Sequence, residues 1–120
     1  MRVAVDLDGT ICEFKAPGQG YGDVRPLPGA VERLRELRRA GHTVIITTAR
    51  NMATCEGNVG KAVRNVGRVT LDWLEAHGVE YDEFHFGKPN ADLYIDDRAL
   101  RFEGWDGLTP ARLEGLGKPR

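Results

Sequence analysis

The sequence has few cysteines, no long apolar run and almost no net charge. Its 120 residues include two cysteines and carry a formal charge of −1, with acids and bases interspersed. This composition provides no basic surface for nucleic acid and no polybasic segment for a membrane, so we expect neither partner. No apolar stretch approaches the roughly 20 residues that span a bilayer.

The two cysteines and the start of the chain bear on the cellular compartment. Cys12 and Cys55 lie far apart in the sequence, without the spacing of metal ligands. The chain begins in a predicted strand rather than in a basic and apolar leader. We therefore expect a reduced, soluble, cytoplasmic protein. The length predicts a single domain with one site.

Short apolar segments alternate with segments of helical periodicity. Four segments have the composition of buried strands: 3–5, 43–47, 83–86 and 93–95. One predicted helix begins near Pro28 and ends at Gly41, and another ends at Gly78. Glycine and proline predict loops at 11–28 and 52–60. Strands separated by helices favour an α/β fold with a parallel sheet and right-handed crossovers.

Polar residues follow each of the four predicted strands. In chain order they are Asp6 and Asp8, Thr48, Lys88, and Asp96 and Asp97. The carboxyl ends of parallel strands lie at one edge of the sheet, where open α/β sheets bind ligands, so we expect these residues to converge. An isolated Asp-x-Asp-Gly is also a common turn sequence. The prediction of a site therefore depends on the four clusters together.

The four clusters resemble the four motifs of the haloacid dehalogenase superfamily of phosphatases. They read, in order, Asp6-Leu7-Asp8-Gly9-Thr10, Thr48, Lys88-Pro89 and Asp96-Asp97. Small phosphatases associated with capsule and polysaccharide biosynthesis show a narrower similarity, over 47–52, 57–61, 81–83, 87–89 and 94–99. The resemblance implies a three-layer, Rossmann-like fold with a central parallel sheet and no cap domain. We expect the catalytic domain at 1–105 and a C-terminal tail with a short helix at 106–120.

The resemblance also implies the catalytic roles. Asp6 would be the nucleophile, forming an aspartyl-phosphate that divides one hard displacement into two easier ones. Asp8 would protonate the leaving oxygen as a general acid and then deprotonate the attacking water. Lys88 offers a positive charge to the phosphate and Asp6, and Thr48 offers a hydroxyl and a backbone amide. Thr47 is the alternative to Thr48, although the Thr-Ala-Arg order beginning at Thr48 resembles the Thr-x-Arg of relatives.

A cation is expected because carboxylates and a dianionic phosphate repel one another by several kcal/mol in a poorly solvated site. Asp6, Asp96 and Asp97 provide oxygen ligands, and the resemblance adds the backbone carbonyl of Asp8. Such hard ligands favour Mg²⁺. The sequence leaves open whether Asp96 or Asp97 binds the metal directly, with the other acting through water or orienting Lys88.

Substrate choice depends on the residues around the motifs. The candidates for substrate binding are Gly9, Thr10, Ala49, Arg50, Asn51 and Lys61. Arg50, Asn51 and Lys61 either contact the leaving group or only shape their loop and face solvent. Small capless relatives act on exposed phosphates or close the site with a neighbouring subunit. By this analogy we expect a homo-oligomer, such as a tetramer.

Three functions fit these residues. The first is a Mg²⁺-dependent phosphatase acting on a small phosphorylated metabolite, with a sugar or polyol phosphate of polysaccharide biosynthesis as the expected substrate. The second is a phosphotransferase or mutase of the same fold, in which another hydroxyl replaces water. The third is a non-enzymatic phospho-accepting regulatory domain, since receiver domains also combine acids, threonine and lysine around Mg²⁺. The position of the aspartate pair on the first strand favours turnover.

Several other residues are assigned to structure rather than to chemistry. Trp73 is expected in the core, on the apolar side of the second helix. The arginines of 33–39 are expected on a solvated helix face, and the three histidines in structural positions.

Overall fold

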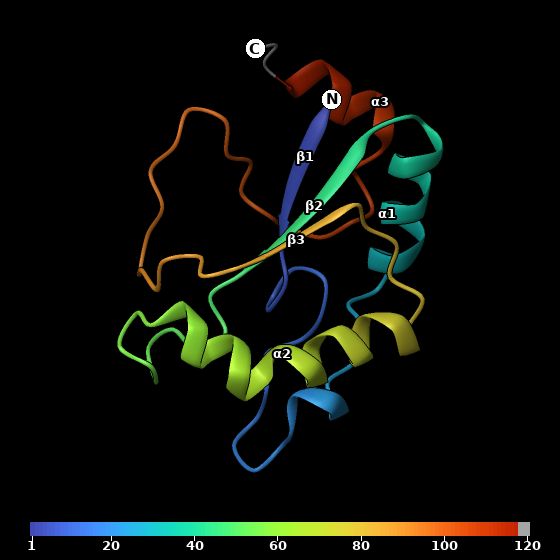
Figure 1. The fold of residues 1–120 in the computed structure, drawn as a ribbon. Coiled ribbons are helices and arrows are strands. Elements are labelled where there is room, and N and C mark those ends of the chain that lie inside the picture. Colours follow the sequence, from blue (N-terminus) through green and yellow to red (C-terminus); the bar gives the residue numbers. More distant parts are fainter. Residues whose placement is uncertain (118–120) are drawn as a thin grey trace.

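The computed structural model describes residues 1–117 and forms a three-stranded parallel sheet with helices packed beside it (Figure 1). The strands are β1 (Arg2–Asp6), β2 (Thr43–Thr48) and β3 (Glu83–Phe86), in the order β1-β2-β3. The helices are the 3-10 helix η1 (Tyr21–Asp23) and the α-helices α1 (Ala30–Arg39), α2 (Val59–Ala76) and α3 (Pro110–Leu116). The predicted α/β fold with a central parallel sheet is confirmed.

The register of the sheet brings the carboxyl ends of the strands to one edge. Asp6 pairs with Thr47, and Thr47 pairs with His85. The connection from β1 to β2 passes through α1, and that from β2 to β3 passes through α2, as parallel neighbours require. The residues that follow β1, β2 and β3 therefore emerge at the same edge of the sheet.

Apolar residues of the helices and alternate residues of the strands form one core. The cluster includes Val5, Val44, Ile46, Leu34, Leu37, Trp73 and Leu74. Trp73 is 3% exposed, and its indole Nε1 donates to the Val24 carbonyl at 2.8 Å. The predicted core position of Trp73 is confirmed.

The two faces of the sheet are buried to different extents. Every second side chain of β2 is buried, beginning with Val44, and the intervening ones are half-buried. On the less buried face, Ala4 and His85 are exposed, and Arg2 pairs with Glu83 at 2.6 Å. This ion pair lowers the pKa of the Glu83 carboxyl below its usual range. The described helices therefore cover mainly the other face.

The predicted fourth strand at 93–95 is wrong for the described structure. Residues 87–104 form an irregular segment that leaves β3, extends away from the sheet and returns toward α3 (Figure 1). Leu93, Tyr94 and Ile95 are 68%, 45% and 93% exposed. Intrinsic β-propensity is weak without packing partners, so three apolar residues do not by themselves make a strand.

Helix α2 begins earlier than the sequence predicts. Asn58 caps it, because its side-chain Oδ1 accepts the Lys61 amide at 3.0 Å. Gly60, expected in the preceding loop, therefore lies in the first helical turn. Within the described part of the chain, no helix is long and apolar enough to cross a membrane.

Hydrogen bonds from α1 hold the C-terminal segment against the rest of the fold. The predicted tail carries α3, whereas its last residues, 118–120, lie outside the described residues. Arg33 Nε donates to the Trp105 carbonyl at 3.3 Å, and its Nη2 donates to the Asp106 carbonyl at 3.2 Å. The Arg33 side chain is only 18% exposed, so the prediction of a solvated arginine is wrong at this position.

Candidate active site

Asp6 and Lys88 meet at the carboxyl edge of the sheet. Asp6 is the last residue of β1, and Lys88 lies two residues beyond β3. Lys88 Nζ lies 3.3 Å from Asp6 Oδ1, and the Lys88 amide donates to the Thr48 carbonyl at 3.1 Å. The Asp6 and Lys88 side chains are 37% and 21% exposed, so both are accessible from solvent. The structure thus joins residues of the first and third motifs.

A tight turn after β1 carries Asp8. The Leu7 carbonyl accepts three backbone amides of this turn, at 2.9–3.2 Å. Gly9 has a φ of +80°, and a Cβ at this position would collide with the Phe14 ring. Glycine adopts such a φ without strain, which explains its place after the second aspartate. Gly9 and Thr10, both candidates for substrate binding, therefore shape the turn that presents Asp8.

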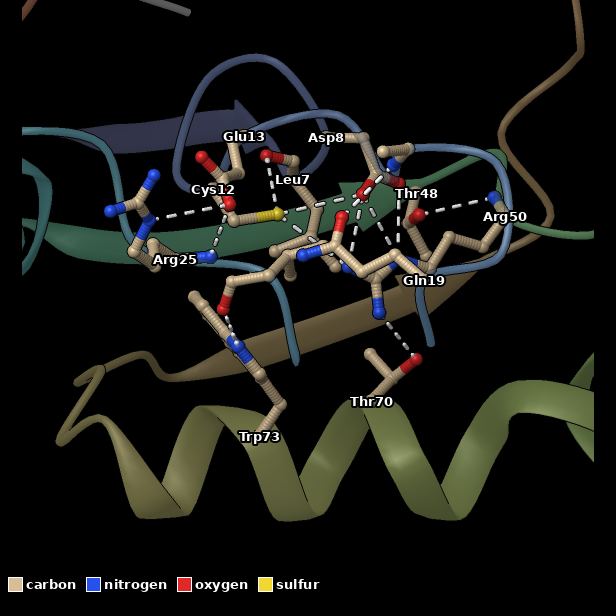
Figure 2. Close-up of polar contacts among 12 residues, drawn as sticks. Leu7, Asp8, Cys12, Glu13, Gln19, Arg25, Thr48, Arg50, Thr70 and Trp73 are labelled. Carbon is tan, nitrogen blue, oxygen red and sulfur yellow. Dashed lines mark hydrogen bonds and ion pairs between the residues drawn. The ribbon is translucent and has the colours of Figure 1, made fainter. Parts of the chain in front are cut away.

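Arg50 holds the Asp8 carboxylate (Figure 2). Arg50 Nε donates to Oδ1 at 3.2 Å and to Oδ2 at 3.0 Å, and Nη2 donates to Oδ1 at 2.9 Å. The Arg50 side chain is fully buried, whereas the Asp8 side chain is 23% exposed. The carboxylate of Asp8 therefore contacts the buried guanidinium and still reaches solvent.

Three residues surround the guanidinium of Arg50. Thr70 of α2 accepts a hydrogen bond from Nη1 at 3.0 Å, and Cys12 Sγ accepts one from Nη2 at 3.5 Å. The Tyr21 ring centroid lies 4.2 Å from the guanidinium carbon, within the range of a cation–π interaction. Burial raises the pKa of the Cys12 thiol to about 12 and also raises the pKa of Tyr21. Both groups therefore stay protonated at neutral pH.

The two threonines at the end of β2 differ in exposure. Thr48 is fully buried, and its Oγ1 accepts the Arg50 amide at 3.1 Å. Thr47 is half-buried and lies beside Asp6 in the sheet register. Parallel neighbours in register share a face, so Thr47 and Asp6 lie on the same side of the sheet. The assignment of phosphate binding to one of the two threonines stays a prediction.

The predicted metal ligands lie in two places. Asp6 and Asp8 are at the sheet edge, whereas Asp96 and Asp97 are in the exposed segment 87–104. Within the described part of the chain, no three His, Cys, Asp or Glu residues form a group that could hold a metal ion. Carboxylate oxygens suit Mg²⁺ chemically, but this arrangement of them does not form a metal site.

The remaining candidates for substrate binding lie between β2 and the start of α2. Asn51 has a φ of +64°, and its Oδ1 accepts from Asn65 Nδ2 at 2.9 Å and from Cys55 Sγ at 3.2 Å. Ala49 is half-buried, and Lys61 is exposed in the first turn of α2. The Asn51 side chain thus shapes its own loop, and a contact between these residues and a leaving group stays a prediction.

Sequence reasoning missed the residues that support Arg50. Neither Thr70 of α2 nor Tyr21 of η1 belongs to one of the four motifs. A threonine among buried apolar side chains does need a hydrogen-bond partner, which is a signal that the sequence contained. No pattern in the sequence pointed from Cys12 to the same cluster, because its neighbours there come from distant parts of the chain.

The sheet topology and the residues at its carboxyl edge place the protein in the haloacid dehalogenase class of phosphatases, which hydrolyse phosphomonoester bonds. The chain belongs to the family described as "5' nucleotidase, deoxy (Pyrimidine), cytosolic type C protein", whose family model matches residues 10–109. Family membership in a class of enzymes argues against the non-enzymatic regulatory function.

A solved structure supports the fold. The chain is similar to the crystal structure of an MCSG target from Vibrio cholerae, with 38% sequence identity and a TM-score of 0.85. The similarity covers 96% of this chain and 94% of that chain. No curated protein matches the chain significantly.

Proposed function

We propose that the protein is a Mg²⁺-dependent phosphatase that forms an aspartyl-phosphate on Asp6 and hydrolyses it with the help of Asp8. The observation that best supports this proposal is the 3.3 Å ion pair between Lys88 and Asp6 at the carboxyl edge of the sheet. A carboxylate held beside an ammonium group can approach a phosphate dianion that would otherwise repel it. The ion pair between Arg50 and Asp8 holds a second carboxylate in the turn after β1.

The proposed chemistry has two steps. In the first, an Asp6 carboxylate oxygen attacks phosphorus, the bond to the leaving oxygen breaks, and Asp8 gives that oxygen a proton. In the second, Asp8 takes a proton from water as the water oxygen attacks phosphorus, and Asp6 is released. Lys88 offsets negative charge in both steps, and Thr47 or Thr48 donates a hydrogen bond to a phosphoryl oxygen.

The proposed cofactor is Mg²⁺, with Asp6, the Asp8 carbonyl, Asp96 and Asp97 as its ligands. Phosphatases of this class typically use this ion, and the donor set contains only oxygen. When bound, Mg²⁺ would neutralise charge on the phosphoryl oxygens. Because the described residues do not bring Asp6, Asp96 and Asp97 together as one metal-binding group, metal binding would require the segment 87–104 to adopt another position.

Two substrate classes are candidates. The similarity over 47–52 and neighbouring segments to capsule and polysaccharide phosphatases favours a sugar or polyol phosphate. The family description names a deoxypyrimidine 5'-nucleotidase, which favours a nucleoside monophosphate. Both are small phosphorylated metabolites, and both end in an alkyl phosphomonoester that needs a general acid. A phosphotransferase or mutase activity would use the same phosphoenzyme with another hydroxyl as acceptor.

The assembly and location of the protein are also part of the proposal. We retain the expectation of a capless homo-oligomer, such as a tetramer, which light scattering after size-exclusion chromatography would test. A cytoplasmic location agrees with the "cytosolic type" of the family description.

The deciding experiment is phosphate release, with Mg²⁺, from a panel of sugar, polyol and nucleoside monophosphates. The purified protein and its Asp6→Asn variant would be compared side by side, with circular dichroism confirming that both are folded. Activity on a narrow set that the variant loses supports the proposal and selects between the substrate classes. Product analysis with added acceptor alcohols separates hydrolysis from transfer, and absence of release from every substrate refutes the phosphatase.

A further inference from the structure

The residue that faces Asp8 from inside the protein is Arg50, and its side chain is fully buried. We propose that Arg50 is a positioning residue, which fixes the Asp8 carboxyl group in the orientation that general acid catalysis requires. This inference rests on the proposed function, since it assigns Arg50 a part in the same phosphatase reaction. It replaces the expectation that Arg50 contacts the leaving group.

The two oxygens of Asp8 have different surroundings. Oδ1 accepts from Arg50 Nη2 at 2.9 Å and from Nε at 3.2 Å, and it also lies 3.5 Å from Cys12 Sγ. Oδ2 accepts from Arg50 Nε at 3.0 Å, its one hydrogen bond to the described residues. Oδ1 is therefore the anchored oxygen, and Oδ2 is the oxygen available to carry a proton to the substrate.

Arg50 is itself held from several sides. Thr70 of α2 accepts its Nη1 at 3.0 Å, and the Tyr21 ring lies against the guanidinium with its centroid 4.2 Å away (Figure 2 draws the threonine contact). The Arg50 amide is bonded to Thr48 Oγ1, which fixes the start of the side chain at the end of β2. With Thr70 and Cys12 bonded to its nitrogens and Tyr21 against its face, the guanidinium keeps one orientation, so Asp8 is held as well.

The burial of Arg50 argues against direct contact with substrate. Its side chain has no exposed area, and its donors point to Asp8, Thr70 and Cys12. No buried side-chain nitrogen or oxygen in the described residues lacks a hydrogen bond. A leaving group would have to displace one of these contacts before it could reach the guanidinium.

This arrangement allows Asp8 to give up a proton in the first step of the reaction and to take one from water in the second. As the proton on Oδ2 passes to the leaving oxygen, the electrons of the broken O–H bond stay on Asp8, which becomes a carboxylate. An Asp6 carboxylate oxygen forms its bond to phosphorus as the bond between phosphorus and the leaving oxygen breaks, with the electrons of the broken bond going to the leaving oxygen. The guanidinium faces the new negative charge without moving, which is the property of a preorganised site.

The experiment compares two leaving groups in the full-length enzyme with Mg²⁺. An alkyl monophosphate that the enzyme accepts depends on the general acid, whereas p-nitrophenyl phosphate depends on it little. Arg50→Lys keeps the charge and loses the fork, and we expect kcat to fall about 10–100-fold on the alkyl substrate and less than about threefold on the aryl substrate. Arg68→Lys, on an exposed position of α2, is the matched control and should leave both rates unchanged.

A double-mutant cycle separates positioning from a structural role. In an Asp8→Asn background, Arg50→Lys should cause no further loss on the alkyl substrate, because the carboxyl group that it positions is absent. Additive losses in the cycle, or equal losses on both substrates, would overturn the proposal. If Arg50→Lys loses its folded circular dichroism spectrum, the Thr70→Val variant tests the proposal instead. It removes one hydrogen-bond acceptor of Arg50 and leaves Asp8 unchanged. We expect the same selective loss, about 3–10-fold on the alkyl substrate alone.

The outcomes also distinguish this inference from the proposed function. A wild-type enzyme that is active, with variants that lose both substrates equally, refutes positioning by Arg50 and leaves the phosphatase intact. A wild-type protein that releases phosphate from neither substrate refutes the phosphatase, and with it the inference.

Discussion

Replacing Lys88 with methionine removes the positive charge beside Asp6 and keeps most of the side-chain volume. The two charges lie 3.3 Å apart, which corresponds to an attraction of about 5 kcal/mol at an effective dielectric constant of about 20, and about 1.3 kcal/mol in bulk water. Because the two side chains are 21% and 37% exposed, solvent screens the pair and its net contribution to stability should be below about 1 kcal/mol.

The effect of Lys88→Met on catalysis should be larger than its effect on stability. Negative charge increases on the phosphoryl group as Asp6 attacks, and a fixed cation lowers the energy of that state without reorganising. The loss of one such group typically costs about 100–1000-fold in kcat. We expect this loss in phosphate release at saturating substrate, with a free energy of unfolding in urea that changes by less than about 1 kcal/mol.

Two control variants make the Lys88 experiment specific. Arg39→Met removes a charge from an exposed position of α1 and should leave kcat unchanged. Lys88→Arg keeps the charge in another geometry and should recover part of the activity. If Lys88→Met keeps kcat within about threefold of the wild-type value, Lys88 does not act on the reacting phosphate and the reasoning fails.

Four further predictions concern the core, the pH dependence of stability, the metal site and the phosphate site. Trp73→Phe leaves the buried Val24 carbonyl unpaired and should lower the free energy of unfolding by about 2–4 kcal/mol, and a loss below about 1 kcal/mol would contradict this. Hydrogen bonds from the Val44 amide and Arg38 lower the pKa of Asp82, so the stability that they provide should be present above the ordinary value of 3.8 and lost as pH falls through the lower folded value. In acid denaturation, the difference in free energy of unfolding between Asp82→Asn and the wild type should disappear in this pH range. A difference that stays constant with pH would refute the role of Asp82. Mg²⁺ should protect 87–104 from limited proteolysis, EDTA should abolish both protection and activity, and indifference to EDTA would refute the metal. In separate kinetic assays, the hydroxyl of either Thr47 or Thr48 should prove essential, and unchanged rates in both valine variants would exclude the two hydroxyls.

The sequence predicts the sheet wherever an apolar run ends in a polar cluster and a helix follows. β1 and β2 meet this condition, and β3 ends in a polar cluster without a helix directly after it. The carboxyl ends of the three strands converge as expected. The segment 93–95 is apolar and is followed by Asp96 and Asp97, but strand pairing depends on tertiary contacts that a local pattern does not contain. The early start of α2 was missed because Gly60 disfavours a helix by about 1 kcal/mol, whereas the Asn58 cap offsets that cost.

The candidate site was predictable in part. The pairing of Asp6 with Lys88 follows from the parallel sheet, since Asp6 ends β1 and Lys88 lies two residues beyond β3 at the same edge. The direction of Arg50 was not predictable, because a residue just beyond a strand end can face the ligand or the interior. Its burial depends on Thr70, 20 residues later on α2, and on a ring from η1. Such partners are known only once the helices are packed.

The two free cysteines give the protein an internal pair of chemical reporters. Thiol reagents react with the thiolate, and with a pKa of about 12 only about one Cys12 in 10⁵ is ionised at pH 7. Cys12 is fully buried, whereas Cys55 is half-buried. Alkylation of Cys55 therefore shows that the reagent is active, and alkylation of Cys12 shows that the turn after β1 has opened. Mass spectrometry of both peptides over time would thus measure how often the segment beside Asp8 opens in the folded protein.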